Sequence, residues 1–288
     1  MVVATIVVAA GALAGLAAGL VVARRGRRGG APTPDDPHVE ASTVRRAVVG
    51  HPLVAAAARR LPGGAGGALA EAMVAAALVV VGVGALAGVL LLAIRADLLV
   101  GVDEPIARFA ARDATASSTS LMRELSEFGG TRYVVVGSIA TLVLALRRDR
   151  RWEVPVFVVV TMIGQFLVSN CIKWTVDRAR PDLSNLTGFA GTSFPSGHAV
   201  AGAAVWMSAA FLLGRDRPRA VRATLVGVAV ALGVGVAGTR VALGVHWTTD
   251  VVAGVVIGWA WFAACAIVFG GRDLRAGEPV EVARDAAS

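Results

Sequence analysis

Long apolar segments alternate with short polar ones along most of this chain. A helix of about 20 apolar residues is long enough to cross the hydrocarbon core of a bilayer. The alternating strands of about ten residues that build a transmembrane barrel are not visible. The pattern therefore predicts an all-α, polytopic membrane protein with seven transmembrane helices. Their expected ranges are residues 2–23, 69–94, 133–146, 154–172, 199–213, 223–238 and 247–269.

Residues 96–130, between the second and third apolar segments, follow a different pattern. Apolar side chains such as Ile106, Phe109, Leu121 and Leu125 recur among charged and polar residues. This amphipathic arrangement predicts a short helical excursion along the outer membrane surface.

Composition agrees with a membrane protein and indicates its orientation. Hydrophobic residues make up 56% of the 288 residues, and the net charge is +8. The positive charges cluster between apolar segments, as the positive-inside rule predicts, so a nucleic-acid partner is not expected. With the N-terminus outside, the inner segments hold 19 of the 27 arginines. The predicted location is therefore the plasma membrane, with the N-terminus outside and the C-terminus in the cytoplasm.

This topology divides the chain into four parts. Residues 1–23 form an N-terminal transmembrane anchor, because the arginines follow the apolar segment instead of preceding it as in a cleaved signal peptide. Residues 24–68 form a cytoplasmic linker, with a candidate amphipathic helix at 44–61 on the inner membrane surface. A six-span domain at 69–270 and a cytoplasmic tail at 271–288 follow.

The anchor carries Gly11, Gly15 and Gly19 at four-residue spacing. A helix face of glycines favours close helix packing. The sequence leaves open whether this face packs within one subunit or between two.

The first of three polar clusters follows the fourth apolar segment and runs from Lys173 to Arg180 and Pro181. If the helix continues to the proline, Lys173 and Arg180 lie on one face, because seven residues are close to two turns. Asp177, four residues after Lys173, is a candidate internal partner. Two cations on one face indicate either an anionic ligand or cations that extend to the membrane interface.

The second cluster is Pro195-Ser196-Gly197-His198, directly before the fifth apolar segment. Pro195 and Ser196 are typical of a helix start. Free N–H groups at a helix N-terminus bind phosphate, and Gly197 permits close approach of a ligand. A capped helix with an interfacial histidine is the alternative interpretation.

The third cluster is Thr239-Arg240, followed by His246 and Asp250. His246 and Asp250 are four residues apart, so they share a face if both lie in the first turns of the seventh helix. The aspartate can accept from one imidazole nitrogen and leave the other free as a nucleophile. Ionisable pairs at the edge of a membrane core are candidates for function; an ordinary interfacial ion pair is the alternative.

All three clusters fall on the outer face in the predicted topology. Cationic donors around a tetrahedral anion, together with two histidines, are typical of phosphoryl transfer. The only acidic residues near the clusters are Asp177, Asp182 and Asp250, which do not form a carboxylate group suited to Mg²⁺. We therefore expect no metal and no cofactor, and nucleophilic catalysis by histidine.

The three clusters resemble the signature motifs of the type 2 phosphatidic acid phosphatases, the membrane branch of the superfamily that includes the vanadium haloperoxidases. The motifs correspond here to Lys173 through Arg180-Pro181, to Pro195-Ser196-Gly197-His198, and to Thr239-Arg240 with His246 and Asp250. Thr239 stands where the family usually has serine, and the hydroxyl is kept. The resemblance covers the last half of the chain and implies a six-helix phosphatase core, to which the first span and the linker are additions.

The resemblance also implies roles. His246 would attack phosphorus and form a phosphohistidine, Asp250 would orient it, and His198 would protonate the leaving oxygen. The phosphate-binding residues would be Lys173, Arg180, Ser196, Gly197 and Arg240. The implied substrate is a lipid monophosphate or diphosphate, with its tail in the bilayer.

Several functions remain open on the sequence. A polyprenyl diphosphate, such as undecaprenyl or decaprenyl diphosphate in cell-wall lipid recycling, is the favoured substrate, with phosphatidylglycerol phosphate and phosphatidate as alternatives. Vanadate-dependent peroxidase chemistry is disfavoured because the peroxidase branch of the superfamily is soluble, whereas this chain is predicted to be embedded in the membrane. A non-catalytic lipid-phosphate binder is disfavoured because both histidines and the aspartate are present.

Overall fold

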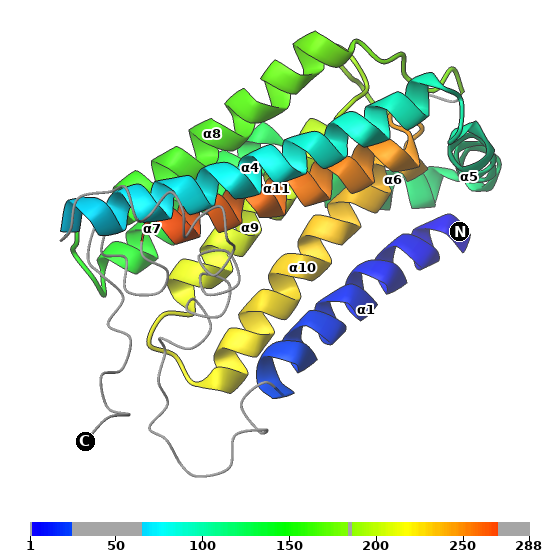
Figure 1. Cartoon of the computed structure of the whole chain (residues 1–288). Coiled ribbons are helices and arrows are strands. Elements are labelled where there is room, and N and C mark those ends of the chain that lie inside the picture. Colours follow the sequence, from blue (N-terminus) through cyan, green and yellow to red (C-terminus); the bar gives the residue numbers. More distant parts are fainter. Residues whose placement is uncertain (1, 25–64, 184–185, 270–288) are drawn as a thin grey trace.

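Every regular element in the described part of the chain is a helix (Figure 1). The computed structural model describes residues 2–24, 65–183 and 186–269. The all-α class is therefore confirmed for these residues. The candidate helix at 44–61 and the tail at 271–288 lie outside them. The helices are α1 (Val2–Arg24), α4 (Ala65–Arg95), α5 (Val100–Asp113), α6 (Ala116–Glu127), α7 (Thr131–Leu146), α8 (Glu153–Val176), α9 (Gly197–Leu213), α10 (Arg219–Ala242) and α11 (Thr248–Val268).

The membrane-spanning capacity of these helices differs. Within the described residues, α8, α10 and α11 are each long and apolar enough to cross a membrane. The pair α6 and α7, bent by 44°, makes a fourth span if it counts as one. The apolar stretches of α1, α4 and α9 are shorter. The fold is thus that of a multi-pass membrane protein, while the division into seven spans stays a prediction.

The amphipathic segment between the second and third apolar segments folds into α5 and α6. The second of these begins at a reciprocal cap. The hydroxyl of Thr115 accepts the N–H of Ser118 at 3.2 Å, and the hydroxyl of Ser118 accepts the N–H of Thr115 at 2.9 Å. This arrangement satisfies N–H groups that the first turn of a helix leaves free. The predicted helical character of this excursion is confirmed.

Helix α9 lies against α11 at very short range because α11 presents glycines to it. A Cβ atom on Gly254 would lie 2.9 Å from the carbonyl oxygen of Ser196, and one on Gly258 would overlap the carbonyl oxygen of Val200. Small residues at a helix contact allow the backbones to approach. This contact brings the second polar cluster, at the start of α9, beside the third, at the start of α11.

The glycine face of α1 packs within the subunit, against α10. A Cβ atom on Gly11 would lie 2.9 Å from the carbonyl oxygen of Ala231, and one on Gly15 would overlap the carbonyl oxygen of Gly227. Gly238, near the other end of the contact, lies against Val7, so the two helices run antiparallel (Figure 1). The predicted close packing is confirmed for Gly11 and Gly15.

The first polar cluster corrects one expectation. Helix α8 ends at Val176, where Asp177 adopts the left-handed conformation with φ of 44°, before it reaches Arg180. The prediction that Lys173 and Arg180 share one helix face is therefore wrong, and Pro181 is not the residue that ends the helix. Aspartate tolerates the left-handed region better than most residues, so the chain turns there.

Candidate active site

The three clusters meet at one end of the bundle, where α8 and α10 end and α9 and α11 begin (Figure 1). The N–H of Ser196 donates to the carbonyl oxygen of Asp250 at 3.1 Å, which joins the second cluster to the third. Arg180 Nη1 lies 3.1 Å from His246 Nε2, which joins the first to the third. The expectation that the clusters share one membrane face is consistent with this convergence.

His246 lies in the loop before α11, one residue ahead of the N-cap Trp247. The prediction that it belongs to the first turns of the helix is therefore wrong, because the helix begins only at Thr248. Asp250 does lie in the first turn and accepts the N–H of Trp247 at 2.9 Å. His246 Nδ1 is 3.5 Å from Asp250 Oδ2, so the two side chains still face each other.

The surroundings of His246 indicate its protonation state. An arginine N–H can only donate, so Nε2 accepts from Arg180 and the proton lies on Nδ1, toward Asp250. Burial lowers the pKa of His246 to about 4, against the opposing effect of Asp250. The imidazole is therefore neutral near pH 7, with the Nε2 lone pair directed at the arginine.

The cations of the site lie close to one another, and contacts with the protein hold them in place. Lys173 Nζ donates to the carbonyl oxygen of Thr192 at 2.8 Å, and Arg180 Nη2 donates to the same oxygen at 3.2 Å. Arg180 also donates to the carbonyl oxygen of Val245 at 2.6 Å. Arg240 is buried and donates to Ser126 Oγ at 2.8 Å. Their charges act on one another, so an anion among them would relieve their repulsion.

The candidate partner Asp177 does not join this group. Among the described residues, no ion pair links it to Lys173, whose ammonium contacts the loop carbonyl of Thr192 instead. The left-handed turn at Asp177 carries the chain away from the end of α8.

The start of α9 presents a hydroxyl to the site. The N–H of Ser196 is taken by Asp250, so this amide is not free to hold a phosphate oxygen. The hydroxyl of Ser196 is buried and, within the described part of the chain, has no hydrogen-bond partner. The same holds for Ser169 Oγ and Arg240 Nε. Such groups are costly to bury unpaired, which indicates a place for a polar ligand or water.

His198 lies in the first turn of α9. It is close enough to His246, Arg180 and Arg240 for their charges to act on it. A Cβ atom on Gly129 would overlap the carbonyl oxygen of His198. The connection between α6 and α7 therefore packs directly against the first turn of α9.

Four residues that the sequence motifs do not indicate hold Asp250 and the first turn of α11: Ser193, Arg178, Asp103 and Thr249. Ser193 Oγ donates to Asp250 Oδ2 at 2.5 Å and lies 3.4 Å from His246 Nδ1. The other carboxylate oxygen of Asp250 accepts from Arg178, which in turn contacts Asp103 and Thr249. The sequence signal was weak, because Arg178 lies within the first cluster without being one of its motif positions, and Asp103 lies in a segment where acidic residues are ordinary.

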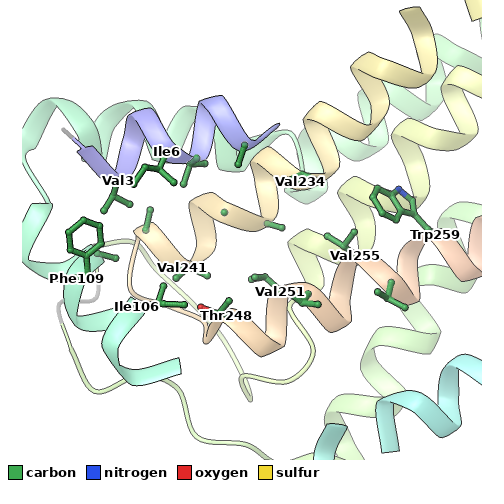
Figure 2. Close-up of a pocket in the computed structure, with 18 residues that line it drawn as sticks. Val3, Ile6, Ile106, Phe109, Val234, Val241, Thr248, Val251, Val255 and Trp259 are labelled. Carbon is green, nitrogen blue, oxygen red and sulfur yellow. The ribbon is translucent and has the colours of Figure 1, made fainter. Parts of the chain in front are cut away.

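An apolar groove lies beside the end of α10 and the start of α11 (Figure 2). Its volume is about 510 Å³, and α1, α5, α10 and α11 all contribute to its walls. Val241 and Thr248 line the groove and lie within two residues of Arg240 and Asp250. Figure 2 labels as its other walls Val3, Ile6, Ile106, Phe109, Val234, Val251, Val255 and Trp259.

Comparison with solved structures defines the class: the chain has the fold of a known helical membrane protein. The transmembrane PAP2-type phosphatidylglycerolphosphate phosphatase from Bacillus subtilis superposes with a TM-score of 0.60. The match covers 64% of this chain and 92% of that one, at 24% identity. At this identity the likeness shows a shared fold.

Residues 155–273 match the PAP2 superfamily model, and this segment belongs to that superfamily. The resemblance drawn from the motifs is thereby confirmed. The segment begins just after the start of α8 and contains all three clusters.

Two bacterial phosphatases are similar in sequence to part of the chain. The lipid A 1-phosphatase of Rhizobium johnstonii is 35% identical over 120 residues, which is 38% of this chain and 45% of that protein. The phosphatidylglycerophosphatase B of Bacillus subtilis is 35% identical over 101 residues, which is 33% of this chain and 48% of that protein. The matched segment therefore spans just under half the length of either relative.

Proposed function

We propose that this protein hydrolyses lipid phosphates by metal-independent, nucleophilic catalysis at His246. The observation that carries the proposal is the position of Nε2, which is directed at Arg180 within the cationic group while Nδ1 faces Asp250. A neutral imidazole held in this way is an activated nucleophile. Membership of residues 155–273 in the PAP2 superfamily, and the names of both relatives, support a lipid phosphatase.

The reaction proceeds in two displacements. In the first, the Nε2 lone pair forms a bond to phosphorus, the bond from phosphorus to the leaving oxygen breaks, and protonated His198 gives that oxygen its proton. Asp250 stabilises the positive charge that develops on the His246 ring. In the second, neutral His198 takes a proton from water, the water oxygen bonds to phosphorus, and the bond from phosphorus to Nε2 breaks. Inorganic phosphate is released and His246 is neutral again.

The phosphate oxygens are bound by the cations and by the unpaired donors. Lys173, Arg180 and Arg240 neutralise charge that develops on the equatorial oxygens. Within the described residues, Arg240 Nε and the hydroxyl of Ser196 are buried without hydrogen-bond partners, and we assign the oxygens of the bound phosphate as their acceptors. Gly197 has no side chain to fill this space: a Cβ atom there would lie 3.8 Å from Ser169 Oγ.

The substrate proposed is a polyprenyl diphosphate in the outer leaflet of the plasma membrane. The arginine distribution supports an outward site, with the N-terminus outside, the C-terminus in the cytoplasm and a six-span core preceded by the α1 anchor. Phosphatidylglycerol phosphate is a second candidate, favoured by the fold shared with the Bacillus subtilis phosphatase.

The proposal is tested by phosphate release from purified protein in detergent. The lipid panel contains undecaprenyl diphosphate, phosphatidylglycerol phosphate, phosphatidate and lipid A 1-phosphate, and the highest kcat/KM identifies the substrate class. His246→Ala removes the nucleophile and should abolish release at unchanged expression and unchanged Tm. Full activity in this variant sinks the nucleophile assignment. Binding without turnover across the panel, or halide oxidation with added vanadate, supports the other functions instead.

Metal independence is tested on the same preparation. Because the proposed chemistry uses only protein groups, dialysis against EDTA should leave kcat/KM within about twofold of its starting value. A loss of activity that Mg²⁺ or Zn²⁺ restores contradicts this part of the proposal.

A further inference from the structure

Asp103 is an acidic side chain buried at the start of α5, with 2% of its surface exposed. Its Oδ1 accepts the N–H of Thr249 at 3.0 Å, and its Oδ2 accepts the hydroxyl of Thr249 at 2.6 Å. Arg178 Nη2 also donates to Oδ2, at 2.8 Å. A buried carboxylate is tolerated only when it is paired and hydrogen-bonded, and Asp103 is both.

Arg178 joins this carboxylate to the catalytic one. Its Nη1 donates to Asp250 Oδ1 at 2.5 Å and to Thr249 Oγ1 at 2.8 Å. The ring of Trp247 lies against the same guanidinium, 5.5 Å from its carbon Cζ. The guanidinium is therefore fixed by Asp103 on one side and by the start of α11 on the other. Asp250 is left with Oδ2 directed toward His246.

We propose that Asp103 is a positioning residue for the reaction at His246, acting through Arg178 and Thr249. It orients the guanidinium that holds Asp250 and fixes the first turn of α11, on which Asp250 lies. This inference rests on the proposed function of the site. It makes the surface helix α5, which lies outside the segment 155–273 that matches the superfamily, part of the catalytic assembly.

The charge balance gives the inference a sign that experiment can check. One arginine between two aspartates leaves a net negative charge facing His246. Removing the charge of Asp103 leaves Arg178 to act on Asp250 alone, and the pKa of His246 falls. Removing the charge of Arg178 has the opposite effect, and that pKa rises. The other charged groups around His246 are Arg180 and Arg240, with His198 and Lys173 nearby, and both variants keep all four.

The first variant is Asp103→Asn, which keeps the size of the side chain. We expect kcat to fall roughly tenfold while KM stays within about twofold of its wild-type value. Losses of about this size are common when a residue that orients a functional side chain is removed. The matched control is Glu104→Gln, which removes the same charge from the next residue of α5. In the described part of the chain, the ion pair of Glu104 is with Arg108 at the exposed surface, so this control should leave kcat unchanged.

The second measurement does not need turnover. Protein labelled with ¹⁵N-histidine is titrated by NMR, and the His246 signal is assigned by its loss in His246→Ala. We expect the midpoint of His246 to move to lower pH in Asp103→Asn and to higher pH in Arg178→Gln. Thr249→Val removes the bridging hydroxyl without a charge change, and it should lower kcat less than Asp103→Asn does while leaving the midpoint in place.

Each outcome decides the proposal. If Asp103→Asn matches Glu104→Gln in kcat and in the His246 midpoint, the positioning role is wrong. If Asp103→Asn does not fold, a wild-type kcat in Thr249→Val equally overturns it, and a partial loss supports it. If the wild-type protein releases phosphate from no lipid, the proposed function fails, and the titration still shows whether Asp103 governs His246.

Discussion

Asp250 is the residue on which the site depends most. It is fully buried, and its two carboxylate oxygens accept from Arg178, Ser193 and the N–H of Trp247. Hydrogen bonds of this kind fix a carboxylate in one orientation and keep it ionised. His246 thus meets a negative charge at Nδ1 and a cation at Nε2, an arrangement that separates its two nitrogens by role.

In the proposed reaction, the protonation of His246 sets the pH dependence. Burial lowers the pKa of His246 to about 4, below the ordinary value of about 6.5. The nucleophile therefore stays neutral on the acid side of pH 6.5, and the acid limb of the kcat/KM profile should lie below that pH. In the proposed reaction His198 is protonated while His246 is neutral, and the negative charge of the bound phosphate favours protonated His198, so the kcat profile should be bell-shaped.

The profile is measured with a lipid monophosphate and with a diphosphate, because the phosphate itself titrates near pH 6. A limb whose midpoint pH is the same with both substrates reports a titrating group of the protein. An enzyme-borne acid limb at or above pH 6.5, or a flat profile, contradicts the assignment.

The His246 imidazole also makes the free energy of unfolding depend on pH. Between about pH 4 and 6.5 the unfolded chain binds a proton at His246 that the folded protein does not, so the free energy of unfolding should fall as pH is lowered through this window. Thermal melting in detergent measures the effect. His246→Ala should show a smaller decrease in Tm than the wild type between pH 6.5 and 4.5. Equal decreases in the two proteins exclude His246 as a source.

Ser193 gives a second prediction at this scale. Ser193→Ala removes a hydrogen bond to the ionised Asp250 and a hydroxyl that lies 3.4 Å from His246 Nδ1. A hydrogen bond to a charged group contributes about 1.5–3 kcal/mol, so kcat should fall about 10- to 100-fold. Ser208→Ala is the matched control, because that buried hydroxyl donates to the carbonyl oxygen of Ala204 in its own helix, away from the site. Equal activity of the two variants contradicts a role for Ser193.

At the scale of elements, packing of α1 on α10 depends on the absence of side chains at two positions. Gly15→Ala places a methyl group on the backbone of Gly227, so the helices must separate, and the free energy of unfolding should fall by about 1–3 kcal/mol. The control is Gly82→Ala on α4, where nothing lies within 4 Å of the added Cβ. That change should leave Tm unchanged or raise it, because alanine favours helix. An equal Tm in the two variants contradicts the packing.

The sequence predicted the helices well because a long apolar segment in a bilayer must satisfy its own backbone hydrogen bonds, and a helix does so within one segment. It predicted the end of α8 poorly. Arg178, Ala179 and Arg180 are compatible with a helix, and only tertiary partners decide otherwise: Arg178 turns to Asp103 and Asp250, and Arg180 turns to loop carbonyls and His246.

The candidate site was predictable where residues lie close in sequence and carry unusual chemistry, as with His246 and Asp250. Ser193 and Asp103 were not, because their partners lie 57 and 146 residues away. Neither a buried serine nor an acidic residue on a surface helix has a local pattern that indicates such a partner.

At the scale of the whole molecule, the convergence of α8, α9, α10 and α11 places every motif residue at one end of the bundle. The loops at the other end include the arginine-rich segment between α7 and α8. Positive charge favours the cytoplasmic side, so the site should face outward.

Cysteine labelling of intact cells checks this orientation. Asp182→Cys, in the exposed loop beside the site, and Arg150→Cys, at the opposite end, are each introduced with Cys171 and Cys265 replaced by serine. A maleimide that does not cross membranes should label the first and leave the second unlabelled until the cells are opened. The reverse pattern contradicts the proposed location.

The carbonyl oxygen of Thr192 accepts from both Lys173 and Arg180. A substrate phosphate needs the same N–H groups, so the peptide group acts as an internal competitor for them. Affinity for any phosphate is then reduced by the fraction of time the loop holds these donors. A lipid whose tail adds binding energy in the bilayer overcomes this competition more readily than free inorganic phosphate does. The loop thereby weakens the binding of the proposed substrate and of inorganic phosphate by the same factor, so the binding energy of the lipid tail is what retains the substrate.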